Sequence, residues 1–209
     1  MDDEKAHAGM SRRTLCIGAG GTVVLFALGG LKALPAQASV RPPGGQDDAH
    51  VIGACIRCER CVEACPKGAL HPSHVEDGIL AVRTPAANFN EGWCDFCTES
   101  HGGRPQCVAY CPTGALTLPE GATAQSVILG KASITKDWCL AWNRNNGCRF
   151  CYDACPYEAI VLDDHKRPVV VPDACNGCGA CQNACVSLQE GSIAEGATER
   201  AIVVRPIAE

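Results

Sequence analysis

Sixteen cysteines in four groups constrain what this chain can fold into more than any other feature of its sequence. The chain has 209 residues and seventeen cysteines, and only Cys16 stands outside the groups. The groups are Cys55, Cys58, Cys61 and Cys65; Cys94, Cys97, Cys107 and Cys111; Cys139, Cys148, Cys151 and Cys155; and Cys175, Cys178, Cys181 and Cys185. Such self-similarity indicates one supersecondary unit, the cysteine motif, repeated along the chain.

The spacing within the first motif indicates the chemistry that the thiols serve. "CIRCERCVEACP" follows C-x2-C-x2-C-x3-C-P, which is typical of [4Fe-4S] clusters in bacterial ferredoxins. Three thiolates surround one cluster, and the fourth ligates the cluster of a partner motif. The endings "ACPKGAL", "YCPTGAL" and "ACPYEAI" repeat, and Val186 replaces proline in the fourth motif. We therefore expect all sixteen cysteines to ligate iron, in four [4Fe-4S] clusters.

Structural zinc and disulfides are the competing uses of these cysteines. Zinc sites use C-x2-C pairs, but they leave the repeated C-x3-C-P ending without a role. An even number of cysteines in an exported chain also suggests disulfides. Thiols two residues apart on one loop, however, cannot all reach distant partners without crowding. Iron–sulfur ligation is therefore the favoured interpretation.

The composition predicts a small fold organised around the clusters. The chain has only three tryptophans, three tyrosines and four phenylalanines, too few to fill a large core. We expect an α+β, loop-rich fold of two ferredoxin-like units with two clusters each. The apolar pair Ala69-Leu70, which follows the first motif, is expected to begin a short strand. The net charge of −5, with scattered positive charges, does not suggest a nucleic-acid partner.

The lengths of the linkers indicate which motifs pair. The motifs are separated by 28, 27 and 19 residues, and the shortest linker reads as strand, turn at Asp163–His165, and strand. This favours adjacent pairing, in which the third motif pairs with the fourth and the first with the second. A nested arrangement, first with fourth and second with third, remains open from the sequence. The expected units are residues 49–120 and 121–209, after a linker at 39–48.

Insertions and bulky residues near the ligands are candidates for secondary roles. Polar, turn-rich inserts at 98–106 and 140–147 can loop out without moving the thiols, either as passive loops or as contacts for a partner. Trp93 and Trp138 directly precede a first cysteine, where they shield a cluster or simply contribute to the core.

Charged and small residues also lie between the ligands. Arg57 and Arg60 lie within the first motif, either as a docking point or as a solvated face. Gly177 and Gly179 in the fourth motif either bring backbone N–H groups near cluster sulfur or meet a simple loop requirement.

The N-terminus has the order of a bacterial signal peptide. Arg12 and Arg13 precede an apolar run at 15–31, and a small-residue cleavage site follows at 36–38. The stretch "SRRTL" resembles the twin-arginine signal, which exports proteins that are already folded. We expect residues 1–38 to direct the chain to the periplasm or the outer face of the cytoplasmic membrane. Retention as an uncleaved anchor is the alternative, although the run is short and carries five glycines.

The chain as a whole resembles the NapG/MauM group of exported ferredoxin-type proteins. The resemblance runs from the leader through "RPPG" at Arg41–Gly44, "ACIRCERCVEACP", "CDFCTE", "PQCVAYCPTGAL", "WCLAWNRNNGCRFCYDACP" and "DACNGCGACQNAC". It implies electron transfer from a membrane-bound, quinol-oxidising iron–sulfur partner toward an exported reductase.

Three functions fit these sequence features. The chain is expected to be an electron carrier, with no catalytic centre of its own. The alternatives are an electron-transfer subunit of a larger oxidoreductase, or a maturation or sensing protein that uses clusters structurally.

Overall fold

The computed structural model describes residues 39–189 and 193–207. These residues lie within one compact unit. The predicted signal peptide, residues 1–38, lies outside the described residues, so export and cleavage stay predictions. Within the described ranges, no helix is long and apolar enough to cross a membrane.

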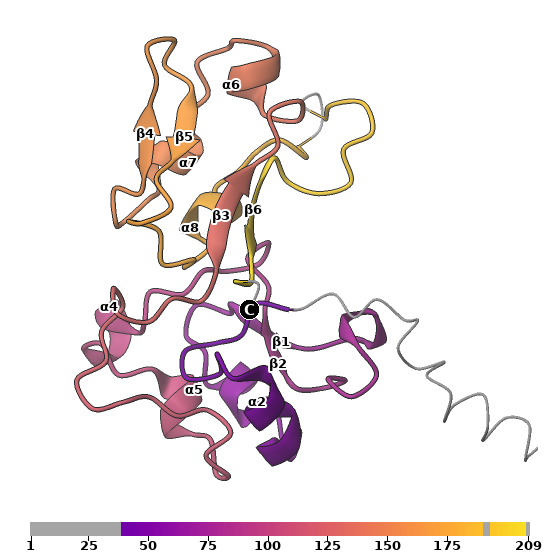
Figure 1. Cartoon of the computed structure of the whole chain (residues 1–209), viewed down its shortest axis with the longest axis vertical. Helices are drawn as coiled ribbons and strands as arrows, with labels where there is room; N and C mark the ends of the chain where they lie inside the picture. The colour runs from indigo at the N-terminus through magenta and orange to yellow at the C-terminus, as the bar shows by residue number, and fades with distance from the viewer. Residues whose placement is uncertain (1–38, 190–192, 208–209) are drawn as a thin grey trace, which may run out of the picture. The chain divides into compact units, whose positions relative to one another are not determined.

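The N-terminal half, residues 39–120, places a β-hairpin between its two cysteine motifs (Figure 1). Its elements are α2 (Asp48–Ala54), α3 (Arg60–Glu63), β1 (Leu70–Pro72), the 3-10 helix η2 (Val75–Asp77), β2 (Pro85–Ala87), α4 (Thr98–His101) and α5 (Gln106–Ala109). β1 and β2 pair antiparallel, with Leu70 opposite Ala87 and Pro72 opposite Pro85. Helix α3 packs against α5 and β1, so the two motifs of this half meet.

The C-terminal half, residues 121–207, repeats this plan and adds a second strand pair (Figure 1). Its elements are β3 (Lys131–Ile134), α6 (Leu140–Asn143), α7 (Phe150–Asp153), β4 (Ile160–Leu162), β5 (Pro168–Val170), α8 (Ala180–Asn183) and β6 (Ile202–Arg205). β4 and β5 form the hairpin, and α7 packs against α8. β3 pairs antiparallel with β6, so the two ends of this half lie side by side.

The two predicted strand features are confirmed. β1 begins at Leu70, as expected for the apolar pair after the first motif. The linker between the third and fourth motifs is a strand, a turn and a strand. Asp163 stabilises that turn, because its Oδ1 accepts hydrogen bonds from the backbone N–H groups of His165 and Arg167 at 2.9 and 2.8 Å. The chain is thus a mixed α/β, loop-rich fold.

Cysteine side chains form part of the core. One apolar cluster combines aliphatic and aromatic residues with thiols and includes Phe89, Val127, Leu129, Ile202, Cys151 and Cys181. A second cluster contains Val51, Leu70, Leu116 and Cys107. The helices of the cysteine motifs have only one turn and the strands have three or four residues, so regular elements alone bury little surface. Much of the packing therefore surrounds the thiols.

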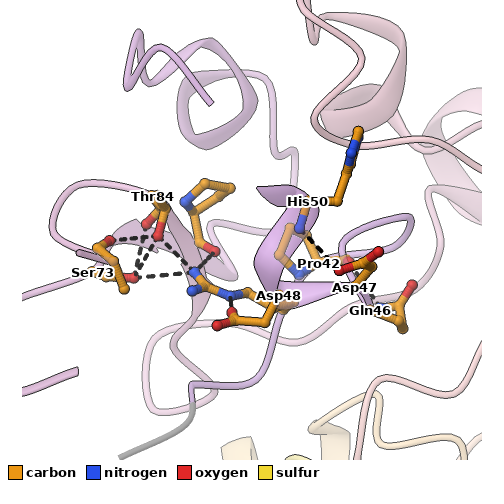
Figure 2. A network of polar contacts seen from close by, with 10 residues as sticks. Pro42, Gln46, Asp47, Asp48, His50, Ser73 and Thr84 are labelled. Carbon is orange, nitrogen blue, oxygen red and sulfur yellow. Dashed lines mark hydrogen bonds and ion pairs between the residues drawn. The ribbon is translucent and has the colours of Figure 1, made fainter. Parts of the chain in front are cut away.

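A buried arginine fastens the segment that was predicted to be a linker (Figure 2). The Arg41 side chain is nearly inaccessible, at 6% exposure. Its Nε donates to Asp48 at 2.6 Å, and its Nη1 donates to Thr84 Oγ1 at 2.8 Å and to the Pro85 carbonyl at 2.9 Å. The guanidinium thus joins the N-terminal segment to helix α2 and strand β2.

The start of helix α2 is specified by Asp47, the residue before Asp48 (Figure 2). Asp47 Oδ1 accepts a hydrogen bond from the His50 backbone N–H at 2.9 Å, which is the geometry of an N-cap. The His50 ring contacts the Gly114 carbonyl at 3.0 Å, and Val51 is fully buried below. Helix α2 therefore closes over the end of the second motif.

We predict that Arg41→Lys lowers the free energy of unfolding by about 2 kcal/mol, because a lysine cannot reach three acceptors at once and leaves buried oxygens unpaired. Anaerobic urea denaturation of the purified protein measures this change. Arg205→Lys is the matched control, because Arg205 pairs with Glu199 on the surface and exposed ion pairs contribute about 0–1 kcal/mol. Equal destabilisation by both changes would contradict the anchoring role.

Candidate metal centres

The structure gathers the cysteines into four sets of four. The first set, Cys55, Cys58, Cys61 and Cys111, lines one pocket. The second set, Cys94, Cys97, Cys107 and Cys65, lines another. The third set, Cys139, Cys148, Cys151 and Cys185, lines a third. In the fourth set, Cys178 and Cys181 lie close enough to Cys155 and Cys175 to interact with them electrostatically.

Each set takes three cysteines from one motif and the fourth from the neighbouring motif. This is the arrangement that adjacent pairing predicts, and nested pairing does not produce it. All sixteen cysteines of the described residues are free thiols. In the same ranges, no three His, Cys, Asp or Glu side chains are placed to hold a single metal ion. Instead, the four thiols of each of the first three sets line a shared pocket.

A left-handed residue shapes every ligand loop. In each motif the residue directly before the second cysteine has a positive φ: 58° at Arg57, 56° at Phe96, 71° at Gly147 and 78° at Gly177. A left-handed residue between extended or helical neighbours turns successive backbone N–H groups toward one point, which favours an anionic group. A thiolate-ligated cluster is such a group, so the loops suit it.

An aspartate or asparagine supports this turn in three of the four motifs. The side chains of Asp95, Asn146 and Asn176 accept hydrogen bonds from the backbone N–H of the second cysteine at 2.8, 3.0 and 3.1 Å. The first motif has Ile56 at this place. Sequence reasoning missed these residues, although "DFC", "NGC" and "NGC" show the signal once the motifs are aligned on their second cysteines.

Backbone N–H groups also reach the sulfur atoms. The Ala69 N–H lies 3.4 Å from Cys65 Sγ, and the Ala159 N–H lies 3.3 Å from Cys155 Sγ. Both donors sit four residues after the last cysteine of a motif, so the repeated C-P-x-x-A ending has a structural role. Hydrogen bonds to sulfur help to set the reduction potential of an iron–sulfur site.

Burial changes the pKa values of several thiols in the sets. Burial raises the pKa of Cys94 and of Cys151 to about 12, and it also raises the pKa of Cys107 and of Cys181. For Cys111 burial also acts upward, but nearby backbone N–H donors outweigh it and lower the pKa. Because the thiolate is the ligand, iron must displace the protons of the buried thiols.

The lining of the pockets fits a thiolate-ligated iron–sulfur cluster. Leu70, Phe89 and Trp93 lie around the second set, and Ile134, Leu140 and Phe150 lie around the third. Asp95 also borders the second set, but its carboxylate already accepts hydrogen bonds from backbone N–H groups. The donors that remain are thiols in apolar surroundings, which is the soft ligand set that iron–sulfur clusters require.

The residues flanking the ligands differ in what they contact. Trp93 lines the second set, with the Lys67 Nζ 5.1 Å from its ring centre. Trp138 packs beside Cys139 in a small apolar cluster. Arg57 donates hydrogen bonds to the carbonyls of the 80–82 loop, and Arg60 is exposed.

The two inserts differ from each other. In the insert at 140–147, Leu140 and Ala141 are buried on helix α6. The insert at 98–106 is mostly exposed and carries helix α4. Contact of either insert with a partner stays a prediction.

Comparison with known proteins supports the iron–sulfur assignment. Two family models described as 4Fe-4S dicluster domains match residues 54–116 and 146–187. The chain is 33% identical over 184 residues to the ferredoxin-type protein NapG of Escherichia coli (strain K12), covering 80% of this chain and 76% of NapG.

Two further relatives are also described as ferredoxin-type proteins. Identity is 33% over 189 residues to the methylamine utilization ferredoxin-type protein MauM of Methylophilus methylotrophus, covering 85% and 80% of the two chains. It is 30% over 154 residues to the ferredoxin-type protein NapF of Escherichia coli (strain K12), covering 72% and 82%.

We predict that Cys65→Ser alters the cluster of the second set, although Cys65 belongs to the first motif. The altered electron paramagnetic resonance (EPR) spectrum of the reduced protein should then match that of Cys107→Ser. Cys58→Ser is the matched control, since it removes a ligand of the same motif but from the first set. A spectrum of Cys65→Ser that matches Cys178→Ser would instead support nested pairing.

Proposed function

Because this chain belongs to the family of ferredoxin-type proteins that includes NapG and MauM, we propose that it relays electrons through four [4Fe-4S] clusters. The electrons pass between a membrane-bound, quinol-linked partner and an exported reductase. The chain is a ferredoxin-type iron–sulfur electron-transfer protein, and the finer proposal rests on the four complete sets of four thiols. Each set is the ligand complement of one cubane cluster.

In this proposal, the residues of the chain bind the clusters and adjust their reduction potentials, and they perform no chemistry on a substrate. A [4Fe-4S] cluster supplies one-electron transfer when it is bound. The sixteen thiolates hold the iron, and the apolar lining keeps water away from it. The N–H groups of Ala69 and Ala159 donate to ligand sulfur and bias the potential.

A permanent subunit of a larger oxidoreductase is the second candidate. Two exposed apolar side chains, Ile56 and Tyr110, line the pocket of the first set, and the exposed Leu80 lies in the loop whose carbonyl oxygens accept hydrogen bonds from Arg57. Ile56 is 63% exposed and Leu80 is 68% exposed. Contiguous exposed apolar surface marks a site of association. A large subunit that stays bound through purification would favour this function over a mobile carrier.

Export to the periplasm or the outer face of the cytoplasmic membrane is part of the proposal. Its support is the order of Arg12-Arg13, the apolar run at 15–31 and the small residues at 36–38. A protein that must receive its clusters before export needs a route for folded chains, and the twin-arginine pathway is that route.

We predict about 16 iron and 16 sulfide per chain, since each cubane contains four of each. Anaerobic purification followed by iron, sulfide and zinc analysis measures this. Removal of the clusters with a chelator and an oxidant should also lower the cooperativity of unfolding, because the buried thiols lose their occupants. A protein that is folded, loaded with zinc and free of iron would contradict the proposed function.

We predict that changing Arg12 and Arg13 together to lysine leaves the protein in the cytoplasm with its clusters intact. The reason is that the twin-arginine pathway recognises the paired guanidinium groups, and lysine retains only their charge. Cell fractionation with iron analysis of each fraction measures the outcome. Lys5→Gln, which leaves the pair intact, is the control and should be exported normally; undiminished export of the double lysine variant would count against the pathway.

A further inference from the structure

We propose that the four cysteine sets form one row in the order first, second, fourth, third, and that Phe89 and Gly179 position the junction between the second and fourth sets. This inference rests on the proposed function, since the row joins the two cluster pairs. The order differs from the order along the chain. It makes the first and third sets the two ends.

A direct hydrogen bond links the second set to the fourth. The backbone N–H of Cys94 donates to the carbonyl oxygen of Cys178 at 2.8 Å. The bonded path between the two sulfur atoms therefore crosses a single hydrogen bond. Cys94 also packs in the same apolar cluster as Cys155, Cys175 and Cys181 of the fourth set, a cluster that Cys151 and Cys185 of the third set share, so the hydrogen bond is what singles out the fourth set.

Packing places the remaining two sets on either side of this junction. Cys55, Cys61 and Cys111 of the first set share an apolar cluster with Cys65 and Cys107 of the second. On the other side, helix α7 of the third motif packs against α8 of the fourth. Cys139 and Cys148 of the third set pack away from the junction, in a small cluster with Trp138 and Trp142.

Gly179 explains how closely the two halves approach. A Cβ atom at this position would lie 2.1 Å from Cδ1 of Phe89, so the ring of Phe89 occupies the space of a side chain. Its φ of 82° is not the reason for glycine, because Glu59 occupies the same place in the first motif with a φ of 61°. The glycine is required by the neighbouring half of the chain.

Gly177, like Gly179, is a glycine of the fourth motif whose counterpart in the first motif carries a side chain. It corresponds to Arg57 in the first motif, and both have positive φ values, 78° and 58°. A Cβ atom at Gly177 would lie 2.4 Å from the backbone of Gly130, which continues from Leu129. The Leu129 N–H also donates to the Asn176 carbonyl at 2.8 Å. The loop of the fourth motif is thus covered, whereas that of the first motif is open.

Polar contacts from helix α8 hold Phe89 in place. The Asn183 Nδ2 donates to the Phe89 carbonyl, and the Gln182 Nε2 donates to Asn90 Oδ1, both at 3.3 Å. Gln182 is buried and its Oε1 accepts from the Val204 N–H of β6 at 2.8 Å. The junction is therefore fastened by α8, the helix within the fourth motif that carries Cys181.

The order of the row is tested with double variants, in each of which only two of the four sets keep all their cysteines. Cys58→Ser with Cys148→Ser removes a ligand from each end and leaves the second and fourth sets intact. Cys97→Ser with Cys178→Ser leaves only the two ends intact. In the reduced, iron-loaded proteins, we expect EPR spin–spin splitting in the first variant and its loss in the second. Splitting between the first and third sets would overturn the order.

The junction itself is tested by Gly179→Ala, in which the added Cβ displaces Phe89. We expect weaker splitting between the second and fourth sets, and exchange of the Cys94 amide hydrogen about tenfold faster, as for the loss of one backbone hydrogen bond. Gly121→Ala is the matched control, because Gly121 also has a positive φ, of 75°, but no atom lies within 4 Å of its Cβ position. It should change neither measurement.

Two further results keep this test decisive. If Gly179→Ala binds no iron, Asn183→Ala removes only the contact to the Phe89 carbonyl and should accelerate exchange of the Cys94 amide in the same direction. Unchanged splitting and exchange in an iron-loaded junction variant would overturn the inference. Absence of iron from the wild-type protein would instead refute the proposed function, so the two failures are distinguishable.

Discussion

The structure depends on one exchange: the last cysteine of each motif completes the set of four thiols of its neighbour. Cys65 and Cys111 are exchanged between the first two motifs, and Cys155 and Cys185 between the last two. A single motif therefore contains no complete set, and two must fold together. This makes the short elements sufficient under the proposed function, because one-turn helices and three-residue strands need only bring the thiols together, and a bound cluster would supply the cross-link.

The ligand loops show why two motifs tolerate inserts. The geometric requirement lies at the left-handed residue before the second cysteine and at the Asx side chain that supports it. The insert at 98–106 begins after this turn, and the insert at 140–147 ends with Asn146 and Gly147, which form it. Neither insert disturbs the turn, so the spacing can change while the orientation of the thiols is kept.

Local features of this fold could be predicted from the sequence, and distant contacts could not. The four cysteine groups, the strand at Leu70 and the hairpin around Asp163 follow from spacing and turn chemistry within a few residues, whereas spacing alone left adjacent and nested exchange of the last cysteine open. The pairing of β3 with β6 and the contacts of Arg41 join residues far apart, and neither short segment carries a pattern that specifies its partner. The hydrogen bond between Cys94 and Cys178 is of the same kind.

Comparison of equivalent positions recovers part of that missing information. All four motifs need the same left-handed turn, so differences among their side chains report the surroundings and not the turn. Arg57 and Glu59 occupy the turn of the first motif, whose loop is open, whereas Gly177 and Gly179 occupy that of the fourth, where Gly130 and Phe89 leave no room for a Cβ atom. Likewise, Ile56 replaces the supporting Asx residue only where its side chain faces solvent. Glycine at such a position is therefore informative only together with its surroundings: Gly147, at the same place of the third motif as Gly177, has no atom within 4 Å of its Cβ position, whereas Gly177 and Gly179 lie against another part of the chain.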